Sequence, residues 1–174
     1  LMHYMDSFSL PYAGGCKLGK RTVLPHIYGL EEFGAHTDIK ASRYEFTVQR
    51  KLPKRSVVMY ESSDTATENV LFAASLTPGK TTIRMATANY MIQDVCLYLN
   101  RLGVKIEGIG TTTLVVHGLS SFPKKSVSFT PTEDPVEAMT FVAAAITTNS
   151  KITIRRVPIE FMELELLKPE KMGL

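Results

Sequence analysis

The sequence predicts an α/β fold built from a repeated unit of about 70 residues, ordered strand–helix–strand–helix–strand–strand. First, LPKRSV at residues 52–57 recurs as FPKKSV at residues 122–127, a shift of 70. Second, the same shift aligns residues 72–77 with 142–147. Third, three helix-end patterns recur around Gly34, Gly103 and Gly173, which are 69 and 70 residues apart. Such units bury their helices against sheets and share a core.

Each unit begins with a strand followed by a helix. Residues 56–60 alternate as a strand does, and residues 126–130 are their copy. Thr65 and Glu68 have capping-box spacing ahead of a helix at residues 68–76. In the copy, Asp134 is a good N-cap and Pro135 suits the first helical position, which predicts a helix at residues 137–146.

Turns at Pro78-Gly79 and Thr148-Asn149 lead into predicted strands at residues 81–84 and 151–155. Apolar residues at helical spacing predict a second helix at residues 90–102, and Cys96 lies on its apolar face. Predicted strands at residues 105–109 and 113–116 complete the unit.

Composition indicates a globular protein, with 44% hydrophobic and 21% charged residues. The net charge of +3 is too small to favour nucleic acid or a membrane surface, and there is no apolar run of transmembrane length or signal peptide. Two dissimilar cysteine segments favour a reduced, cytoplasmic protein. Since the chain lacks an initiator Met and stops after a helix-like segment, we expect it to be a piece of a longer one.

The most unusual segment is the glycine-rich stretch 12–21, YAGGCKLGKR. Cys16 lies within five residues of Lys17, Lys20 and Arg21, and positive neighbours favour a reactive thiolate. The alternative is an exposed loop cysteine with incidental lysines. Cys96 is predicted to be a core residue. No metal-ligand cluster or cofactor-binding motif is present, so neither a metal nor a cofactor is expected.

Other polar residues allow two interpretations each. Arg21 could grip a phosphate or carboxylate, or be a solvated side chain. Ser63 precedes a helix N-terminus, which attracts anions, although simple capping explains it equally. His26 fits a structural histidine better than a catalyst. The basic residues at 50–55 suit a solubilising hairpin, with nucleic-acid binding as the alternative.

Several of these segments together resemble the UDP-N-acetylglucosamine 1-carboxyvinyltransferase family of enolpyruvyl transferases. GGCKLGKR at residues 14–21 resembles the family's catalytic-cysteine segment. The similarity continues in TATENV at 65–70, KIEGIGT at 105–111, and AAAIT at 143–147 after Asp134. It extends over nearly all 174 residues in the same order.

The resemblance implies part of an EPSP-synthase-like inside-out α/β barrel, in which about six units form two domains. Residues 1–132 would be the later part of the first domain, including the catalytic loop 12–21. Residues 133–174 would be the truncated start of the second. The rest of the same polypeptide would then be an obligatory partner, and this segment alone would be inactive.

The resemblance also implies roles for four residues. Cys16 would be the general acid that forms a covalent adduct with phosphoenolpyruvate and is alkylated by fosfomycin. Arg21 would hold the phosphate of phosphoenolpyruvate, Ser63 would lie against the UDP diphosphate, and Asp134 would mark the start of the second domain. The reaction would transfer an enolpyruvyl group to the 3′-hydroxyl of UDP-N-acetylglucosamine, the first committed step of peptidoglycan synthesis, without a cofactor.

Some positions depart from the family pattern. Glu61 stands where a lysine near the nucleotide phosphates is usual, and Thr65 where glycine is common. Leu24 replaces an Asp, Pro135 an Arg, and Ala88-Asn89-Tyr90-Met91 an Arg-Glu-Pro-Glu stretch. These departures predict either a different acceptor or a divergent paralogue that binds without catalysis. A nucleic-acid binder built on similar repeats is a further alternative.

Overall fold

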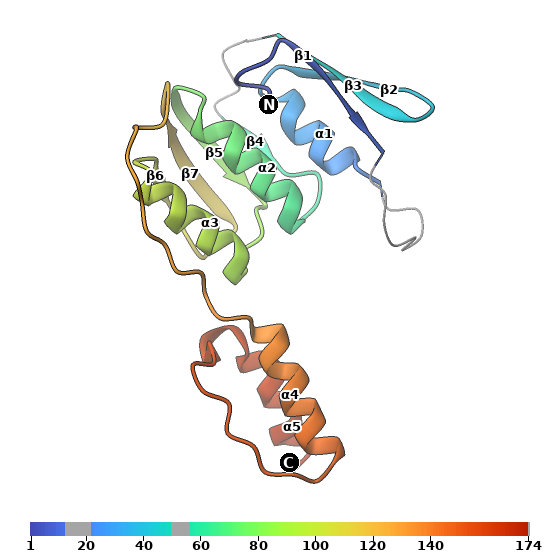
Figure 1. Cartoon of the computed structure of the whole chain (residues 1–174), viewed down its shortest axis with the longest axis vertical. Helices are drawn as coiled ribbons and strands as arrows, with labels where there is room; N and C mark the ends of the chain where they lie inside the picture. Colours follow the sequence, from blue (N-terminus) through green and yellow to red (C-terminus); the bar gives the residue numbers. More distant parts are fainter. Residues whose placement is uncertain (13–21, 50–55, 174) are drawn as a thin grey trace. The chain divides into compact units, whose positions relative to one another are not determined.

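The computed structural model describes residues 1–12, 22–49 and 56–173, and it divides into two compact units, Leu1–Ser128 and Phe129–Leu174. Each unit is described by itself. In the first unit, a four-stranded sheet carries two helices, α2 and α3, side by side on one face (Figure 1). The strand order is β4-β5-β7-β6, with bounds Ser56–Val58, Gly79–Arg84, Thr113–Gly118 and Lys105–Glu107.

The order of elements along this part of the chain is the predicted one. The helix α2 (Asp64–Ser75) connects the parallel strands β4 and β5, and α3 (Tyr90–Arg101) leads to the antiparallel pair β6 and β7. The predicted strand–helix–strand–helix–strand–strand unit is therefore confirmed between residues 56 and 118.

The core of the first unit lies between this sheet and its two helices. One face of the sheet is apolar because inward residues alternate with outward ones, as period-two strands require. The inward set of the sheet, Val57, Ile83, Ile106, Leu114 and Val116, is buried. Small residues of α2 and the apolar stripe of α3 cover it, with Cys96 buried as predicted.

A three-stranded sheet precedes this arrangement, and the sequence interpretation did not include it. Its strand order is β1-β3-β2, all antiparallel, and α1 (Leu24–Glu31) packs beside it; the strand bounds are Ser7–Pro11, Arg43–Val48 and Ala35–Ile39. Adding the period of 70 to β3 gives residues 113–118, which is β7. The order β1-β3-β2 thus repeats β5-β7-β6, so the repeat extends further toward the N-terminus than predicted.

The second unit holds the helix α4 (Pro135–Thr147), a 3₁₀ turn at Ile159–Phe161, and α5 (Glu163–Lys171). The strands predicted at residues 126–130 and 151–155 were wrong, since both segments are irregular. In the first unit β5 is held between β4 and β7. Adding 70 to the residue numbers of β7 gives positions beyond residue 174. The predicted strand at residues 151–155, the copy of β5, therefore has no copy of β7 to pair with here. Isolated pairs of short strands are only marginally stable.

Helix termini confirm most of the local predictions. Gly34, Gly103 and Gly173 follow α1, α3 and α5, and all three adopt the positive φ that favours glycine after a helix. The capping box predicted at Thr65 was wrong. The helix α2 starts at Asp64, with Ser63 as its N-cap, so Thr65 and Glu68 both lie inside the helix.

Candidate functional site

The four residues predicted to form the site do not all fall in the described structure. Cys16 and Arg21 lie outside the described residues. Ser63 belongs to the first unit and Asp134 to the second, so the structure describes them separately. The basic residues of segment 50–55 are also outside the described part.

Ser63 lies at the N-terminus of α2 in extended conformation, with φ −119° and ψ 131°. Its side chain makes no capping hydrogen bond to the helix. Its carbonyl accepts from the backbone N–H of Thr67 at 2.9 Å and from the Thr67 hydroxyl at 2.7 Å. The Ser63 hydroxyl is therefore not committed to the helix, and the N–H groups at this helix terminus suit an anion.

The N-termini of α1 and α2 lie side by side at the same end of the first unit (Figure 1). His26 on α1 joins them. Asn69 Nδ2 lies 2.7 Å from His26 Nδ1, and Thr65 Oγ1 lies 3.4 Å from His26 Nε2. The sequence interpretation treated His26 as structural and missed this arrangement, because its partners are 39 and 43 residues away.

The surroundings of His26 favour its neutral imidazole. Burial lowers its pKa, and the carboxylate of Glu61 opposes this by favouring the charged form. The Asn69 amide N–H donates to Nδ1, which must then carry the free lone pair. The remaining proton is on Nε2, facing the Thr65 hydroxyl, so both ring nitrogens have a partner.

The segment that forms β4 and the first turns of α2 carries only negative charge. Residues 56–69 include three carboxylates, Glu61, Asp64 and Glu68, and no lysine or arginine. Burial raises the pKa of Glu68, and the nearby Asp64 raises it further. Glu61 is exposed, directly before the two serines that lead into the helix. A polyanionic ligand bound here would need positive charge from another part of the protein.

Asp134 is the N-cap of α4, as predicted. Its carboxylate accepts from the backbone N–H of Val136 at 2.8 Å and of Glu137 at 3.3 Å. Pro135 occupies the first helical position and is buried. The carboxylate of Asp134 is exposed and thus accessible to solvent while it caps the helix.

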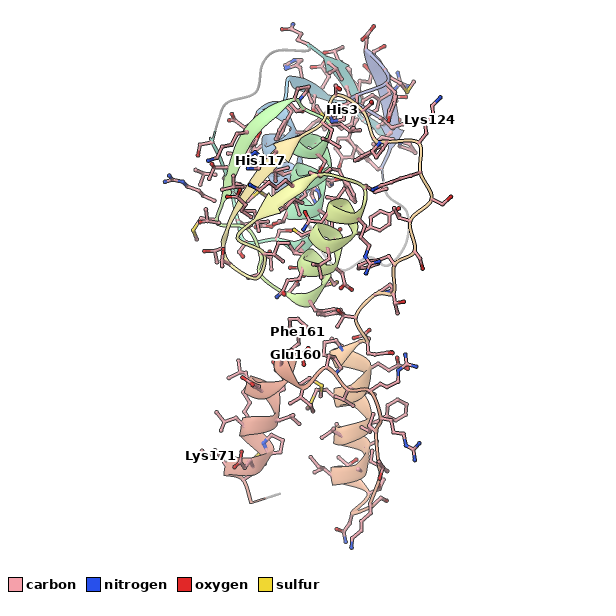
Figure 2. All side chains as sticks on the ribbon, turned by 90° about the vertical axis from the view of Figure 1, so that its left-hand side faces the viewer. His3, His117, Lys124, Glu160, Phe161 and Lys171 are labelled. Atoms are coloured by element: carbon pink, nitrogen blue, oxygen red, sulfur yellow. The ribbon has the colours of Figure 1, made fainter. Side chains whose placement is uncertain are left out.

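Neither Cys96 nor His117 has an environment suited to catalysis. Burial raises the pKa of the Cys96 thiol to about 12, which leaves it unreactive near neutral pH. His117 on β7 lies 3.2 Å from Glu107 on the sheet (Figure 2). Within the described ranges, no group of three or more acidic, histidine or cysteine side chains could hold a metal. No helix in that part of the chain is long and apolar enough to cross a bilayer.

Comparison with known proteins gives the family. The family model for EPSP synthase (3-phosphoshikimate 1-carboxyvinyltransferase) matches residues 4–174. An enolpyruvyl transferase, NikO from Streptomyces tendae, has a similar solved structure, with a TM-score of 0.66 and 22% identity over 83% of this chain and 34% of that chain. The fold is thus part of the enolpyruvyl transferase fold, and the chain belongs to the EPSP synthase family.

Within that family, the chain is similar to UDP-N-acetylglucosamine 1-carboxyvinyltransferases. It is 38% identical to the Aeromonas hydrophila protein of that name over 95% of this chain and 38% of the relative. It is 33% identical to UDP-N-acetylglucosamine 1-carboxyvinyltransferase 1 of Symbiobacterium thermophilum over 99% of this chain and 39% of the relative. The chain therefore spans less than two-fifths of the length of these relatives.

Proposed function

We propose that the full-length polypeptide carrying this chain transfers the enolpyruvyl group of phosphoenolpyruvate to the 3′-hydroxyl of UDP-N-acetylglucosamine and releases phosphate. The observation that carries the proposal is the similarity to relatives named for this activity, over 95% of the chain at 38% identity. In this proposal residues 1–132 belong to the first domain of the enzyme and residues 133–174 begin the second.

The proposed chemistry is addition followed by elimination. The acceptor hydroxyl loses its proton as its oxygen forms a bond to the enol carbon that bears the phosphate, and the methylene carbon gains a proton as the C=C double bond becomes single. The tetrahedral intermediate then loses a proton from the new methyl group, and the C–O bond to phosphate breaks. Such a reaction depends on positioning and on donors placed where charge develops.

Cys16 is the proposed general acid and site of the covalent adduct, and Arg21 the proposed ligand of the phosphoenolpyruvate phosphate. Their support is the GGCKLGKR segment in the sequence. Ser63 is the proposed contact to the UDP diphosphate, supported by its hydroxyl being free of a capping bond at a helix N-terminus. Asp134 is proposed to face the substrates from the second domain.

The departures from the family pattern favour one alternative, a divergent paralogue that binds without catalysis. Glu61 brings negative charge to the end of α2 where the diphosphate is proposed to bind. Other departures have structural roles: Pro135 starts α4, and Asn89 caps α3 by accepting from the Ile92 N–H at 3.1 Å. Thr65 faces His26.

The proposed setting is the cytoplasm, where the reaction would supply peptidoglycan synthesis. The proposed partners are phosphoenolpyruvate, a UDP-amino sugar and the rest of the polypeptide, with no cofactor. Nucleic-acid binding through segment 50–55 remains the third hypothesis, and RNA binding that weakens steeply with salt would favour it.

The test is phosphate release by the full-length polypeptide from phosphoenolpyruvate, with and without UDP-N-acetylglucosamine. We expect release that depends on the acceptor, that is lost in a Cys16→Ala variant, and that fosfomycin abolishes by labelling Cys16 and not Cys96. A folded protein that releases no phosphate under these conditions contradicts the proposal. In that case, retained binding of UDP-N-acetylglucosamine in calorimetry would support the non-catalytic paralogue.

A further inference from the structure

Three contacts of different chemistry fix α1 against the β4–α2 segment. His26 bonds with Asn69 and faces Thr65. The rings of Tyr28 and Tyr60 are tilted by 59° with centroids 5.0 Å apart. Gly29 lies so close to α2 that an added Cβ would be 2.5 Å from Val70 Cγ2. The two helices therefore have a defined register, and His26 supplies its polar contact at the N-terminal end.

The contact of His26 with Asn69 and Thr65 is specific because each side chain must supply a particular donor or acceptor. Asn69 donates to Nδ1, and the Nε2 proton faces the hydroxyl of Thr65. Leucine at position 26 could fill space there but would remove the acceptor that the exposed Asn69 amide uses in the folded protein. Glutamine could still offer a carbonyl oxygen to Asn69. The two substitutions thus separate the packing role of His26 from its hydrogen bonds.

The partners of His26 lie in the first turns of α2, directly after Ser63. Thr65 is two residues from Ser63, and Asn69 is about one helical turn beyond Thr65. The position of Ser63 relative to the start of α1 consequently depends on the contacts of His26. We propose that His26 is a positioning residue for acceptor binding, which holds Ser63 and the N-terminus of α2 in register with α1. This inference rests on the proposed function, which assigns Ser63 to the acceptor.

A positioning role of this kind has a characteristic kinetic effect. Ser63 contacts the acceptor and takes no part in bond making, so displacing it weakens the ground state and the transition state alike. Such a loss raises KM for the acceptor and leaves kcat nearly unchanged. One hydrogen bond between neutral groups corresponds to roughly a threefold to tenfold change in KM.

The experiment measures kcat, both KM values and the thermal midpoint for the full-length polypeptide and its variants His26→Leu, His26→Gln and Asn69→Leu. We expect His26→Leu and Asn69→Leu to raise KM for UDP-N-acetylglucosamine by roughly threefold to tenfold, with KM for phosphoenolpyruvate unchanged. His26→Gln should restore most of the loss. His117→Gln is the matched control, since His117 contacts Glu107 on the sheet, and it should change neither constant.

Acceptor KM within twofold of wild type in a folded His26→Leu protein would overturn the inference. If His26→Leu raises both KM values and lowers kcat in proportion to its loss of stability, the inference would also be overturned, because these changes indicate a purely structural role. If His26→Leu does not fold, Asn69→Ser, which removes the same donor with a smaller change, decides between these outcomes. A wild-type protein without turnover refutes the proposed function, whereas normal turnover with unaffected variants refutes this inference alone.

Discussion

The environment of His26 makes the stability of the first unit depend on pH. Its pKa is lowered by burial, and Asn69 donates to its Nδ1. An unfolded histidine titrates near 6.5, so below that pH the unfolded chain binds more protons than the folded one. The stabilising contribution of His26 is thus present above about pH 6.5 and is lost as the pH falls toward the lower folded-state pKa.

We predict that lowering the pH from 7.5 to 5.5 reduces the stability of the protein more than that of a His26→Gln variant. The measurement is the urea midpoint of each protein at the two pH values. Both proteins share the same carboxylates, so the effect of these groups cancels in the difference between wild type and variant. Glu61 is the opposing charge, so Glu61→Gln should lower the His26 pKa further and deepen the loss. Identical pH dependence in wild type and His26→Gln would contradict this account.

Cys96 gives a second prediction for a single side chain. Its thiol is buried with a pKa of about 12, so almost no thiolate forms near neutral pH. Iodoacetamide at pH 8 should leave Cys96 unmodified in the native protein and alkylate it rapidly in denaturant, as peptide mass mapping would show. Alkylation of Cys96 at equal rates in both conditions would refute the burial.

Local sequence signals predicted some of these residues and not others. Asp134 followed by Pro135 is a contiguous capping signal, and the predicted N-cap is confirmed. Cys96 followed from helical periodicity. The bond between His26 and Asn69 joins residues 43 apart, so no local pattern could indicate it. The pairing became visible only when α1 and α2 were placed side by side.

The sequence predicted helices better than strands, for the same reason. Helices α2, α3 and α4 were predicted because their periodicity and caps are local. The strands predicted at residues 126–130 and 151–155 were wrong because a local pattern does not supply the hydrogen-bonded neighbours that a strand needs. The three-stranded sheet was missed although residues 43–48 alternate polar and apolar residues, a local signal that could have indicated a strand. Residues 35–39 lack such alternation.

The close packing of α1 on α2 predicts the effect of adding one methyl group. An alanine at position 29 would place its Cβ 2.5 Å from Cγ2 of Val70, a completely buried side chain. We expect Gly29→Ala to destabilise the first unit by about 1–3 kcal/mol, despite the better helix propensity of alanine. Urea unfolding measures the loss.

A matched double variant tests the cause. Val70→Ala removes the clashing methyl group, so Gly29→Ala should cost less in a Val70→Ala background than in wild type. Strictly additive losses would show that the two positions do not contact each other.

The N-cap of α4 predicts a loss of stability that can be measured separately from turnover. Replacing Asp134 with alanine removes the acceptor of two backbone N–H groups and should destabilise the second unit by about 1 kcal/mol. Asp134→Asn should retain most of the capping, because asparagine is an equally good N-cap. If Asp134→Asn keeps stability but lowers turnover of the full-length polypeptide, the charge itself serves the substrates. Equal stability of the alanine variant and wild type would contradict the capping geometry.

The molecule as a whole is two compact units of a family whose similar relatives are more than twice as long. The 70-residue repeat predicted the unit at residues 56–118, but its predicted copy in the second unit shares only the helices. The fold of the family is retained over the matched part of the chain. Activity therefore has to be tested on the full-length polypeptide.

The most direct test identifies the product by NMR after incubating the full-length polypeptide with phosphoenolpyruvate and UDP-N-acetylglucosamine. The account predicts an enol ether at the 3′-oxygen of the sugar and one phosphate released for each molecule formed. A correctly folded protein that yields no enol ether, or that releases phosphate without forming one, would contradict it.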